Sequence, residues 1–265
     1  MRAIISCTSD PLYSYYLPIS AFCWNKLGVK VVAFTPDVVS KATFFAMQTM
    51  NFEHKNENLS FGFIARDDKR PTYSQLSRLM AWGIKDIDDN EVVYTSDSDM
   101  LNFQLPPYDD SFDFTVWGYD LTPNNQYPVC YVGAKKKTWN QYFAVGDNGY
   151  QEALDYHLGG IECDNMRGNY WCYEQELIFN TLQNANCKLI PRSNGQNQFA
   201  LNRVDRTDLH YKDRLNPDTL VDAHLWRPGY TDENFPKILE LMQIMYPNEG
   251  FQWLIDYTNA YKQLL

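Results

Sequence analysis

Apolar residues recur along this chain with two different periods. Runs of β-formers at residues 2–7 and 29–34 are typical of buried strands, and the segment between them repeats apolar side chains at the spacing of a helix that ends at Gly28. A strand–helix–strand unit favours a parallel sheet. We therefore predict an α/β fold whose first strand begins almost at the first residue.

The same two periods alternate through the rest of the chain. Polar composition predicts a loop over residues 194–218. Thr72 with Gln75 fits a capping box, which would mark the start of a helix. The chain has no internal repeat and no low-complexity linker. Further strands are predicted at 59–64, 92–94, 112–117, 128–134, 187–191 and just before His224, and further helices at 37–50, 72–87, 138–158 (one or two helices), 171–185 and 231–265.

One predicted strand leads into two carboxylates. Residues 92–94 are β-formers, and polar Thr95 and Ser96 separate them from Asp97 and Asp99. The carboxyl end of a strand in an α/β sheet opens on the crevice where ligands bind. Two carboxylates facing that crevice repel each other unless a cation lies between them, and hard divalent ions with oxygen ligands suit that position. The alternative is a solvated acidic turn, because Asp-x-Asp is a short and common pattern.

The overall charge restricts the partners. A formal net charge of −10, with no basic stripe or tail, argues against nucleic acid, because the chain lacks a cluster of cations that would release counterions. An anionic nucleotide remains compatible, since a bound metal and one or two arginines reverse the local field. Aromatic residues make up 15% of the chain, which suits a core and also the walls of a nucleotide or sugar site.

The cysteines and the N-terminus indicate the compartment. The 6 cysteines form no C-x-x-C pair, so we expect neither a zinc site nor a disulfide framework. We find no signal peptide pattern, and no apolar run reaches the length of a transmembrane segment. We therefore expect a soluble protein in a reducing, cytoplasmic compartment.

Other polar positions have two interpretations each. The chain lacks G-x-G-x-x-G and a P-loop, yet the loop at 8–10 after the first strand is placed either to hold a base or ribose or to serve as a plain turn. Arg78 is either solvated or directed at a diphosphate beside the acidic motif. Glu174 and Gln175 begin a predicted helix, where negative charge serves chemistry or simply suits the helix dipole. Gly133 permits either close approach of a ligand or a bend.

Four features occur in one order, and together they resemble a known class. They are the N-terminal strand–turn–helix, a capped helix containing Arg78, the strand-terminal Asp97-Ser98-Asp99, and the late His224. This order resembles the GT-A class of nucleotide-sugar glycosyltransferases, whose metal-binding D-x-D motif looks like Asp97-Ser98-Asp99. The resemblance spans roughly residues 1–230.

Within that class, glycosyltransferase family 8 is the most similar pattern. Its late segment His-x-x-Gly-x-x-Lys-Pro-Trp is similar to residues 224–229, His-Leu-Trp-Arg-Pro-Gly, in the histidine and the basic-Pro pair, but not in the glycine spacing or the final Trp. Its Asp-Gln pair at a helix start is similar to Glu174-Gln175. The chain also looks like the small GT-A domains of large algal-virus glycosyltransferases, and this resemblance implies a role in viral or bacterial glycan synthesis.

The resemblance implies a fold and a division of labour. A Rossmann-like, nucleotide-binding mixed sheet flanked by helices is expected as a single domain over residues 1–265. Residues 1–135 form the nucleotide-sugar-binding half, residues 136–230 the acceptor-binding half, and residues 231–265 the C-terminal helices. The same resemblance implies that Mn²⁺ (or Mg²⁺) binds Asp97, Asp99 and His224, that Glu174 and Gln175 are catalytic, and that Tyr170 and Trp171 contact the acceptor. It also implies that the nucleotide sugar contacts Thr8, Ser9, Asp10, Arg78, Asp97, Ser98 and Arg227.

The implied activity is transfer of a hexose from a nucleotide diphosphate sugar, with UDP-hexose as donor and a glycan or glycoprotein as acceptor. Histidine beside two carboxylates favours Mn²⁺ over Mg²⁺, because imidazole suits a softer ion. Retention and inversion at the anomeric carbon both remain open. Two other functions are compatible with the fold: a nucleotidyltransferase, which the lack of a Gly-rich N-terminal loop argues against, and a non-catalytic nucleotide- or sugar-binding protein.

Overall fold

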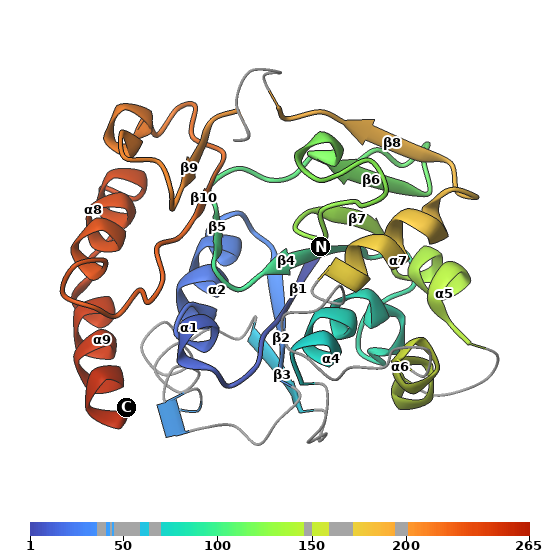
Figure 1. Ribbon diagram of the computed structural model, residues 1–265, viewed down its shortest axis with the longest axis horizontal. Coiled ribbons are helices and arrows are strands. Elements are labelled where there is room, and N and C mark those ends of the chain that lie inside the picture. Colours follow the sequence, from blue (N-terminus) through green and yellow to red (C-terminus); the bar gives the residue numbers. More distant parts are fainter. Residues whose placement is uncertain are drawn as a thin grey trace.

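A mixed sheet forms the centre of the molecule (Figure 1). The computed structural model describes residues 1–35, 41–42, 44, 59–63, 70–145, 150–158, 172–193 and 201–265. Within these residues the sheet has 7 strands in the order β3-β2-β1-β4-β7-β6-β8. Only β7 runs against its neighbours. The strands are β1 (Arg2–Ser6), β2 (Lys30–Thr35), β3 (Leu59–Phe63), β4 (Val92–Asp97), β6 (Phe114–Trp117), β7 (Val132–Lys135) and β8 (Cys187–Ile190).

The central strand β1 shows why these runs become strands. Ala3, Ile4 and Ile5 are fully buried, and they alternate between two hydrophobic clusters on opposite faces of the sheet. A parallel strand covered on both faces needs an unbroken apolar run, which is the pattern in the sequence. The predicted α/β class is therefore confirmed, and the predicted strands are found in place, with β6 and β7 shorter than expected.

The two N-terminal helices lie on one face of the sheet, and the two C-terminal helices pack against them. Figure 1 shows α8 above α9, with both alongside α2 and α1. Tyr15, at the end of α1, stacks on Tyr257 of α9 with ring centroids 5.4 Å apart and shares a 2.8 Å hydrogen bond with Thr258. The predicted helices at 231–265 are thus part of the core. Their bounds are α1 (Pro11–Ser14), α2 (Leu17–Lys26), α8 (Phe235–Met245) and α9 (Gln252–Leu264).

The opposite face carries the helix that leads into the acidic strand. This helix begins at Arg70, so Thr72 lies inside it and the capping box predicted at Thr72 is wrong. Pro71 explains the earlier start, because proline is tolerated in the first turn, where its missing N–H is not needed. The elements here are α4 (Arg70–Ser77), η1 (Arg78–Gly83), α5 (Lys136–Phe143), α6 (Tyr150–Leu158) and α7 (Tyr173–Leu182).

A second, three-stranded sheet was not predicted as such. Its order is β5-β10-β9, with β5 antiparallel and β9 parallel to β10. The prediction of a loop throughout 194–218 is wrong, since β9 and the short helix η4 lie there, and β5 was missed. Each strand has only three residues, too few to show a period. The remaining bounds are β5 (Met100–Asn102), β9 (Arg203–Asp205), β10 (Asp222–His224), η2 (Tyr119–Leu121) and η4 (Tyr211–Arg214).

Gly133 lies on β7 beside a neighbouring strand. A Cβ there would come within 2.7 Å of the Tyr94 ring. A side chain, rather than a ligand, therefore takes the space that this glycine leaves. The helix predicted at 37–50 lies almost entirely outside the described residues.

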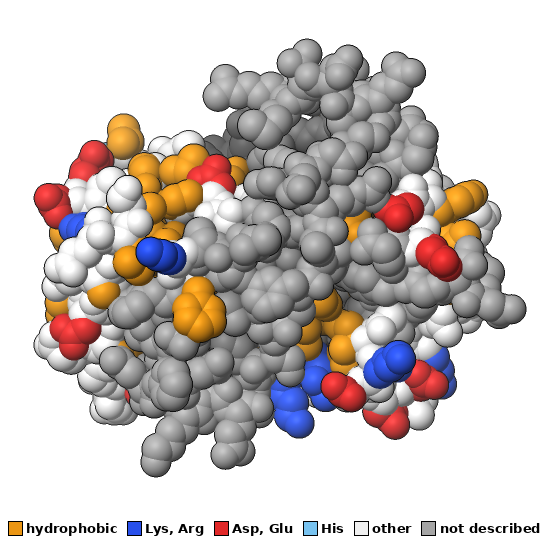
Figure 2. Space-filling model, turned by 90° about the horizontal axis from the view of Figure 1, so that it is seen from below, with side chains coloured by type: hydrophobic (Ala, Val, Ile, Leu, Met, Phe, Trp, Pro, Cys, Tyr) orange, Lys and Arg blue, Asp and Glu red, His pale blue; other side chains and the backbone are white. Residues whose placement is uncertain are grey.

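The described surface carries charges of both signs. Figure 2 shows Lys and Arg side chains interspersed with Asp and Glu over the described part of the lower face. Among the described residues, no helix has the length and apolar character needed to cross a membrane. The described cysteines are free thiols, and Cys7 and Cys23 are buried.

Candidate active site

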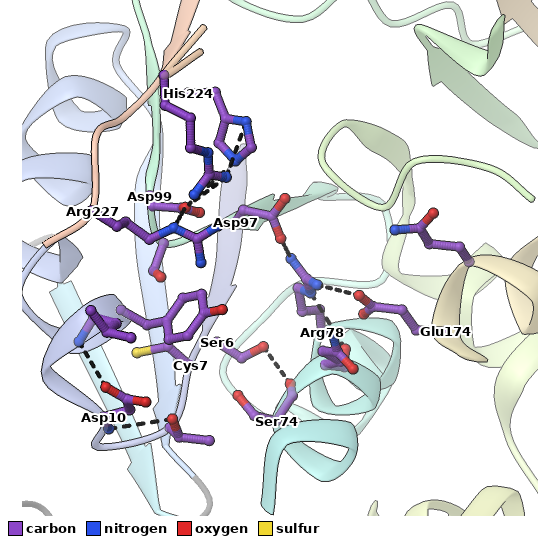
Figure 3. Close-up of a pocket in the computed structure, with 17 residues that line it drawn as sticks. Ser6, Cys7, Asp10, Ser74, Arg78, Asp97, Asp99, Glu174, His224 and Arg227 are labelled. Atoms are coloured by element: carbon purple, nitrogen blue, oxygen red, sulfur yellow. Dashed lines mark hydrogen bonds and ion pairs between the residues drawn. The ribbon is translucent and has the colours of Figure 1, made fainter. Parts of the chain in front are cut away.

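A cavity of about 400 Å³ opens at the carboxyl ends of β1 and β4. Its walls come from the loop after β1, the junction of α4 with η1, the turn after β4, the start of α7, and the segments after β9 and β10 (Figure 3). Segments far apart in the sequence thus meet at the edge of the sheet where ligands bind in α/β folds.

The acidic motif forms the turn between β4 and β5. Asp97 is the last residue of β4 and lies beside Ser6 of β1 in the sheet. Ser98 and Asp99 follow in the turn and are buried, and the Asp99 carbonyl accepts a 3.0 Å hydrogen bond from Leu225 N. The motif is therefore held inside the cavity, and the alternative of a solvated acidic turn is wrong.

Arg78 lies between two carboxylates (Figure 3). Its guanidinium forms an ion pair with Asp97 through Nη1, and its Nη2 lies 2.5 Å from Glu174 Oε1. The same Nη1 donates a 3.1 Å hydrogen bond to the Ser96 carbonyl. Only 3% of Arg78 is exposed, so the interpretation of a solvated arginine is wrong.

The pKa values of the two acids that share Arg78 shift in opposite directions. Burial favours the neutral form of each carboxyl group. At Asp97 the charge and hydrogen bonds of Arg78 outweigh burial, and the pKa falls below its usual value. At Glu174 burial outweighs Arg78 and raises the pKa to about 7. Glu174 and its neighbour Gln175 lie in the first turn of α7, as predicted, and Glu174 Oε2 is buried without a hydrogen-bond partner.

Asp99 is approached by cationic groups at a single oxygen. Its Oδ2 lies 3.3 Å from Arg206 Nη2, 3.3 Å from Arg227 Nε and 3.5 Å from His224 Nε2. None of these contacts satisfies it as a hydrogen bond. Burial and the charge of Asp97 raise the pKa of Asp99, although His224 and Arg227 oppose the shift.

His224 ends β10 and also contacts β9. Its Nδ1 lies 3.4 Å from Asp205 Oδ2 and 3.1 Å from Arg206 Nη2. Burial lowers the pKa of the imidazole, but Asp205 and Asp99 outweigh it, so the pKa is raised overall. The three-residue pairing of β10 with β5 therefore brings the late histidine to the acidic turn, as the sequence led us to expect.

Arg227 is positioned by two tyrosines of the N-terminal helices. Its guanidinium carbon lies 4.7 Å from the centre of the Tyr13 ring, and Tyr16 Oη donates a hydrogen bond to the carbonyl of the preceding residue, Trp226. A Cβ at Gly229 would lie 2.6 Å from Tyr16 Oη, so the tyrosines require glycine there.

The predicted base and ribose loop lies at the cavity in part. Thr8 and Asp10 line it, and Asp10 also accepts a 2.8 Å hydrogen bond from Leu12 N at the start of α1. Ser9 is not part of the lining, and its carbonyl accepts a hydrogen bond from Ser14 Oγ. The predicted acceptor residues Tyr170 and Trp171 lie outside the described residues.

Seven lining residues were not among the predicted site residues; they are Ser6, Cys7, Leu12, Tyr13, Ser74, Gln75 and Arg206. Arg206 lies in the segment interpreted as a loop. It directly follows β9, whose three residues are too few to show the pattern of a strand. Tyr13 precedes the apolar repeat of α2 and carried no signal of its own.

The residue types here suit a divalent ion. Asp97, Asp99 and His224 line one cavity, and the buried Asp99 Oδ2 lacks a hydrogen bond, which leaves it able to bind a cation. Two carboxylates and an imidazole are a donor set for Mn²⁺. Asp97 is turned to Arg78, and within the described ranges no three His, Cys, Asp or Glu side chains are grouped as a metal cluster.

Comparison with solved structures identifies the fold. The chain has the fold of the GT-A-type glycosyltransferases. The galactosyltransferase LgtC, solved with donor and acceptor sugar analogues, matches over 100% of both chains with a TM-score of 0.50 at 11% identity. An active-site mutant of LgtC matches over 91% of this chain and 95% of its own, with a TM-score of 0.51 at 12% identity.

A second glycosyltransferase gives the same result. GlyE of Streptococcus pneumoniae TIGR4 matches over 99% of this chain and 64% of GlyE, with a TM-score of 0.53 at 11% identity. No protein-family profile and no curated protein sequence matches the chain. At these identities the likeness defines the fold, and the activity must be argued from the site.

Proposed function

We propose that this protein is a metal-dependent glycosyltransferase that moves a hexose from a nucleotide diphosphate sugar, with UDP as the nucleotide, to a hydroxyl group of a glycan or glycoprotein. The observation that carries the proposal is the single cavity in which Asp97, Asp99, His224 and Glu174 meet, at the ligand-binding edge of a GT-A-type sheet. Its volume of about 400 Å³ is within the range of small-molecule sites.

Donor binding is assigned to the N-terminal half, residues 1–135, together with His224 and Arg227. We place the base and ribose at Thr8, Ser9 and Asp10, and the diphosphate near Ser98 and Arg227. Asp99 and His224, with Asp97, would hold Mn²⁺ or Mg²⁺. When bound, the ion neutralises charge on the leaving diphosphate as a Lewis acid.

Glu174 is the carboxylate assigned to the transferred sugar. It lies across the cavity from Asp99, on α7, and Arg78 fixes its orientation. A pKa of about 7 suits proton transfer near neutral pH, because such a group is present in both protonation states. In an inverting reaction Glu174 accepts the proton of the acceptor hydroxyl.

In a retaining reaction the Gln175 side chain stabilises the positive charge on the sugar and the leaving phosphate takes the proton. The anomeric configuration of the product, measured by NMR, decides between these two roles. We assign acceptor binding to the half formed by residues 136–230, with Tyr170 and Trp171 as the stacking residues.

Calorimetric titration of UDP tests the proposal. Wild type should bind UDP with Mn²⁺ and lose most of that affinity with a chelator. Asp99→Ala should weaken binding by about tenfold or more, because one charged contact on this scale is worth about 1.4 kcal/mol or more. The matched control is Asp232→Ala, whose carboxylate is 99% exposed on the surface.

UDP binding that a chelator leaves unchanged would contradict the metal site. Metal-dependent binding of GDP in place of UDP would change the donor only. Binding without turnover of any nucleotide sugar would indicate the non-catalytic binding protein, and formation of a nucleotide sugar from a sugar phosphate and a nucleoside triphosphate would indicate the nucleotidyltransferase.

A further inference from the structure

The three arginines of the cavity differ in how their donors are used. The Arg78 guanidinium already pairs with Asp97 and Glu174 and donates a hydrogen bond to the Ser96 carbonyl. Arg206 differs, because its Nη1 is buried and has no hydrogen-bond partner. A buried donor without a partner carries a desolvation cost that an incoming acceptor would remove.

Asp99 is shared by two of these arginines. Its Oδ2 faces Arg206 and Arg227 at 3.3 Å each, with His224 at 3.5 Å on the same oxygen. One carboxylate therefore faces two permanent positive charges without a satisfied hydrogen bond. Asp205, the nearest further acid on β9, is occupied by His224 and by the amide and hydroxyl groups of Thr207.

The geometry of the two side chains suits an anion with several oxygens. They reach the cavity from different segments, Arg206 after β9 and Arg227 after β10, and both lie on the Asp99 side of it. A guanidinium presents donors in a planar fork that matches phosphate oxygens, which gives it charge-assisted hydrogen bonds stronger than those to neutral groups.

We propose that Arg206, together with Arg227, binds the diphosphate of the nucleotide donor, and that Asp99 holds the pair in place while the site is free of nucleotide. This inference rests on the proposed function and adds a residue that the sequence did not indicate. Arg78, whose donors are taken, instead orients Asp97 and Glu174 and does not bind phosphate.

Titrations on Arg206→Gln test the assignment. The ligands are UDP, uridine, and inorganic pyrophosphate, each with Mn²⁺ present, and Mn²⁺ itself without nucleotide. The variant should bind UDP and pyrophosphate about tenfold to a hundredfold more weakly and uridine unchanged. Arg206→Lys, which keeps the charge but loses the fork, should restore part of the affinity. The matched control is Arg214→Gln, because Arg214 pairs with Asp208 at 2.6 Å outside this cavity.

The Mn²⁺ titration separates phosphate binding from support of the metal ligands. Loss of a cation 3.3 Å from Asp99 should leave Mn²⁺ affinity unchanged or tighter if Arg206 serves the phosphates. Weaker Mn²⁺ binding, or equal loss of UDP and uridine, would show a structural role and overturn the assignment.

Unchanged binding of UDP and pyrophosphate by Arg206→Gln would also overturn it while leaving the proposed function intact. If wild type binds pyrophosphate but not UDP, and Arg206→Gln loses that binding, the phosphate assignment stands and the proposed donor is wrong. If wild type binds neither, both proposals fail.

Discussion

At the scale of single residues, the cavity is organised by one guanidinium shared between two acids. Arg78 lowers the pKa of Asp97 but leaves that of Glu174 raised to about 7. Burial is therefore stronger than attraction at one acid and weaker at the other. This division gives the site one carboxylate that stays charged and one that exchanges a proton near neutrality, which is the arrangement that acid–base chemistry requires.

The raised pKa of Glu174 predicts a pH-dependent stability. Its folded-state pKa is above the unfolded value, so the folded state holds the proton more tightly. That contribution is fully present below about pH 4.5 and is lost as the pH rises through about 7. Wild type should lose on the order of 3 kcal/mol relative to Glu174→Gln over this window, at about 1.4 kcal/mol per pKa unit.

Urea unfolding of both proteins from pH 4.5 to 7.5 measures the difference. Glu176→Gln is the control, because Glu176 lies in the same turn of α7 outside the cavity. Parallel stability curves for wild type and Glu174→Gln would contradict the raised pKa.

At the scale of elements, a buried ion cluster joins the two sheets. Asp222 of β10 lies 2.8 Å from Arg203 Nε on β9 and 2.5 Å from Arg192 Nη1, just after β8. Burial would raise the pKa of Asp222, but the two arginines outweigh it and hold the pKa well below its usual range. Since β10 ends at His224, this cluster fixes the strand that carries the histidine into the site.

Asp222→Asn should therefore be strongly destabilising. It leaves two arginines buried without a counter-charge, a change that costs about 3–5 kcal/mol in comparable buried pairs. Thermal unfolding, compared with wild type and with Asp218→Asn on the exposed loop before β10, measures the loss. A midpoint equal to that of the control would show that the cluster does not hold the sheets together.

The elements also show how far sequence alone reaches. Apolar runs made four strands predictable from the sequence, namely β1, β2, β4 and β8. Asp97 and Asp99 could be predicted as site residues because they follow such a run. The strands β5 and β9 have three residues each, and both pair with β10, which is distant in the sequence. Arg206 follows β9 and was missed for that reason. The partners of Arg78 depend on α7, whose position relative to α4 no local pattern contains.

At the scale of the whole molecule, the C-terminal helix α9 packs against the tyrosines that position Arg227. Tyr15 and Tyr16 are fully buried, and Tyr15 packs on Tyr257 and Tyr261 of α9. Tyr16 in turn holds the Trp226 carbonyl, next to Arg227. We therefore propose that residues 231–265 belong to the same domain as the cavity.

Truncation tests that proposal. A chain ending at residue 230 would expose Tyr15 and Tyr16, which are fully buried, and we expect it to lose cooperative unfolding and aggregate. The control ends at Lys262 and removes only exposed residues. Calorimetry of both proteins measures the outcome. Cooperative unfolding of the shorter chain near the wild-type midpoint would show that α8 and α9 form a separate unit.

Glycosyl transfer is the proposed activity, and a turnover assay measures it. Purified protein should release UDP from at least one UDP-hexose, slowly with water and faster with an acceptor sugar, in the presence of Mn²⁺. A chelator should stop the reaction, and Asp99→Ala should slow it by about 100-fold or more, the scale of a preorganised electrostatic contact. The control Asp232→Ala should react like wild type. Absence of turnover across UDP- and GDP-hexoses, or turnover equal in Asp99→Ala and wild type, would contradict the proposed metal-dependent glycosyl transfer.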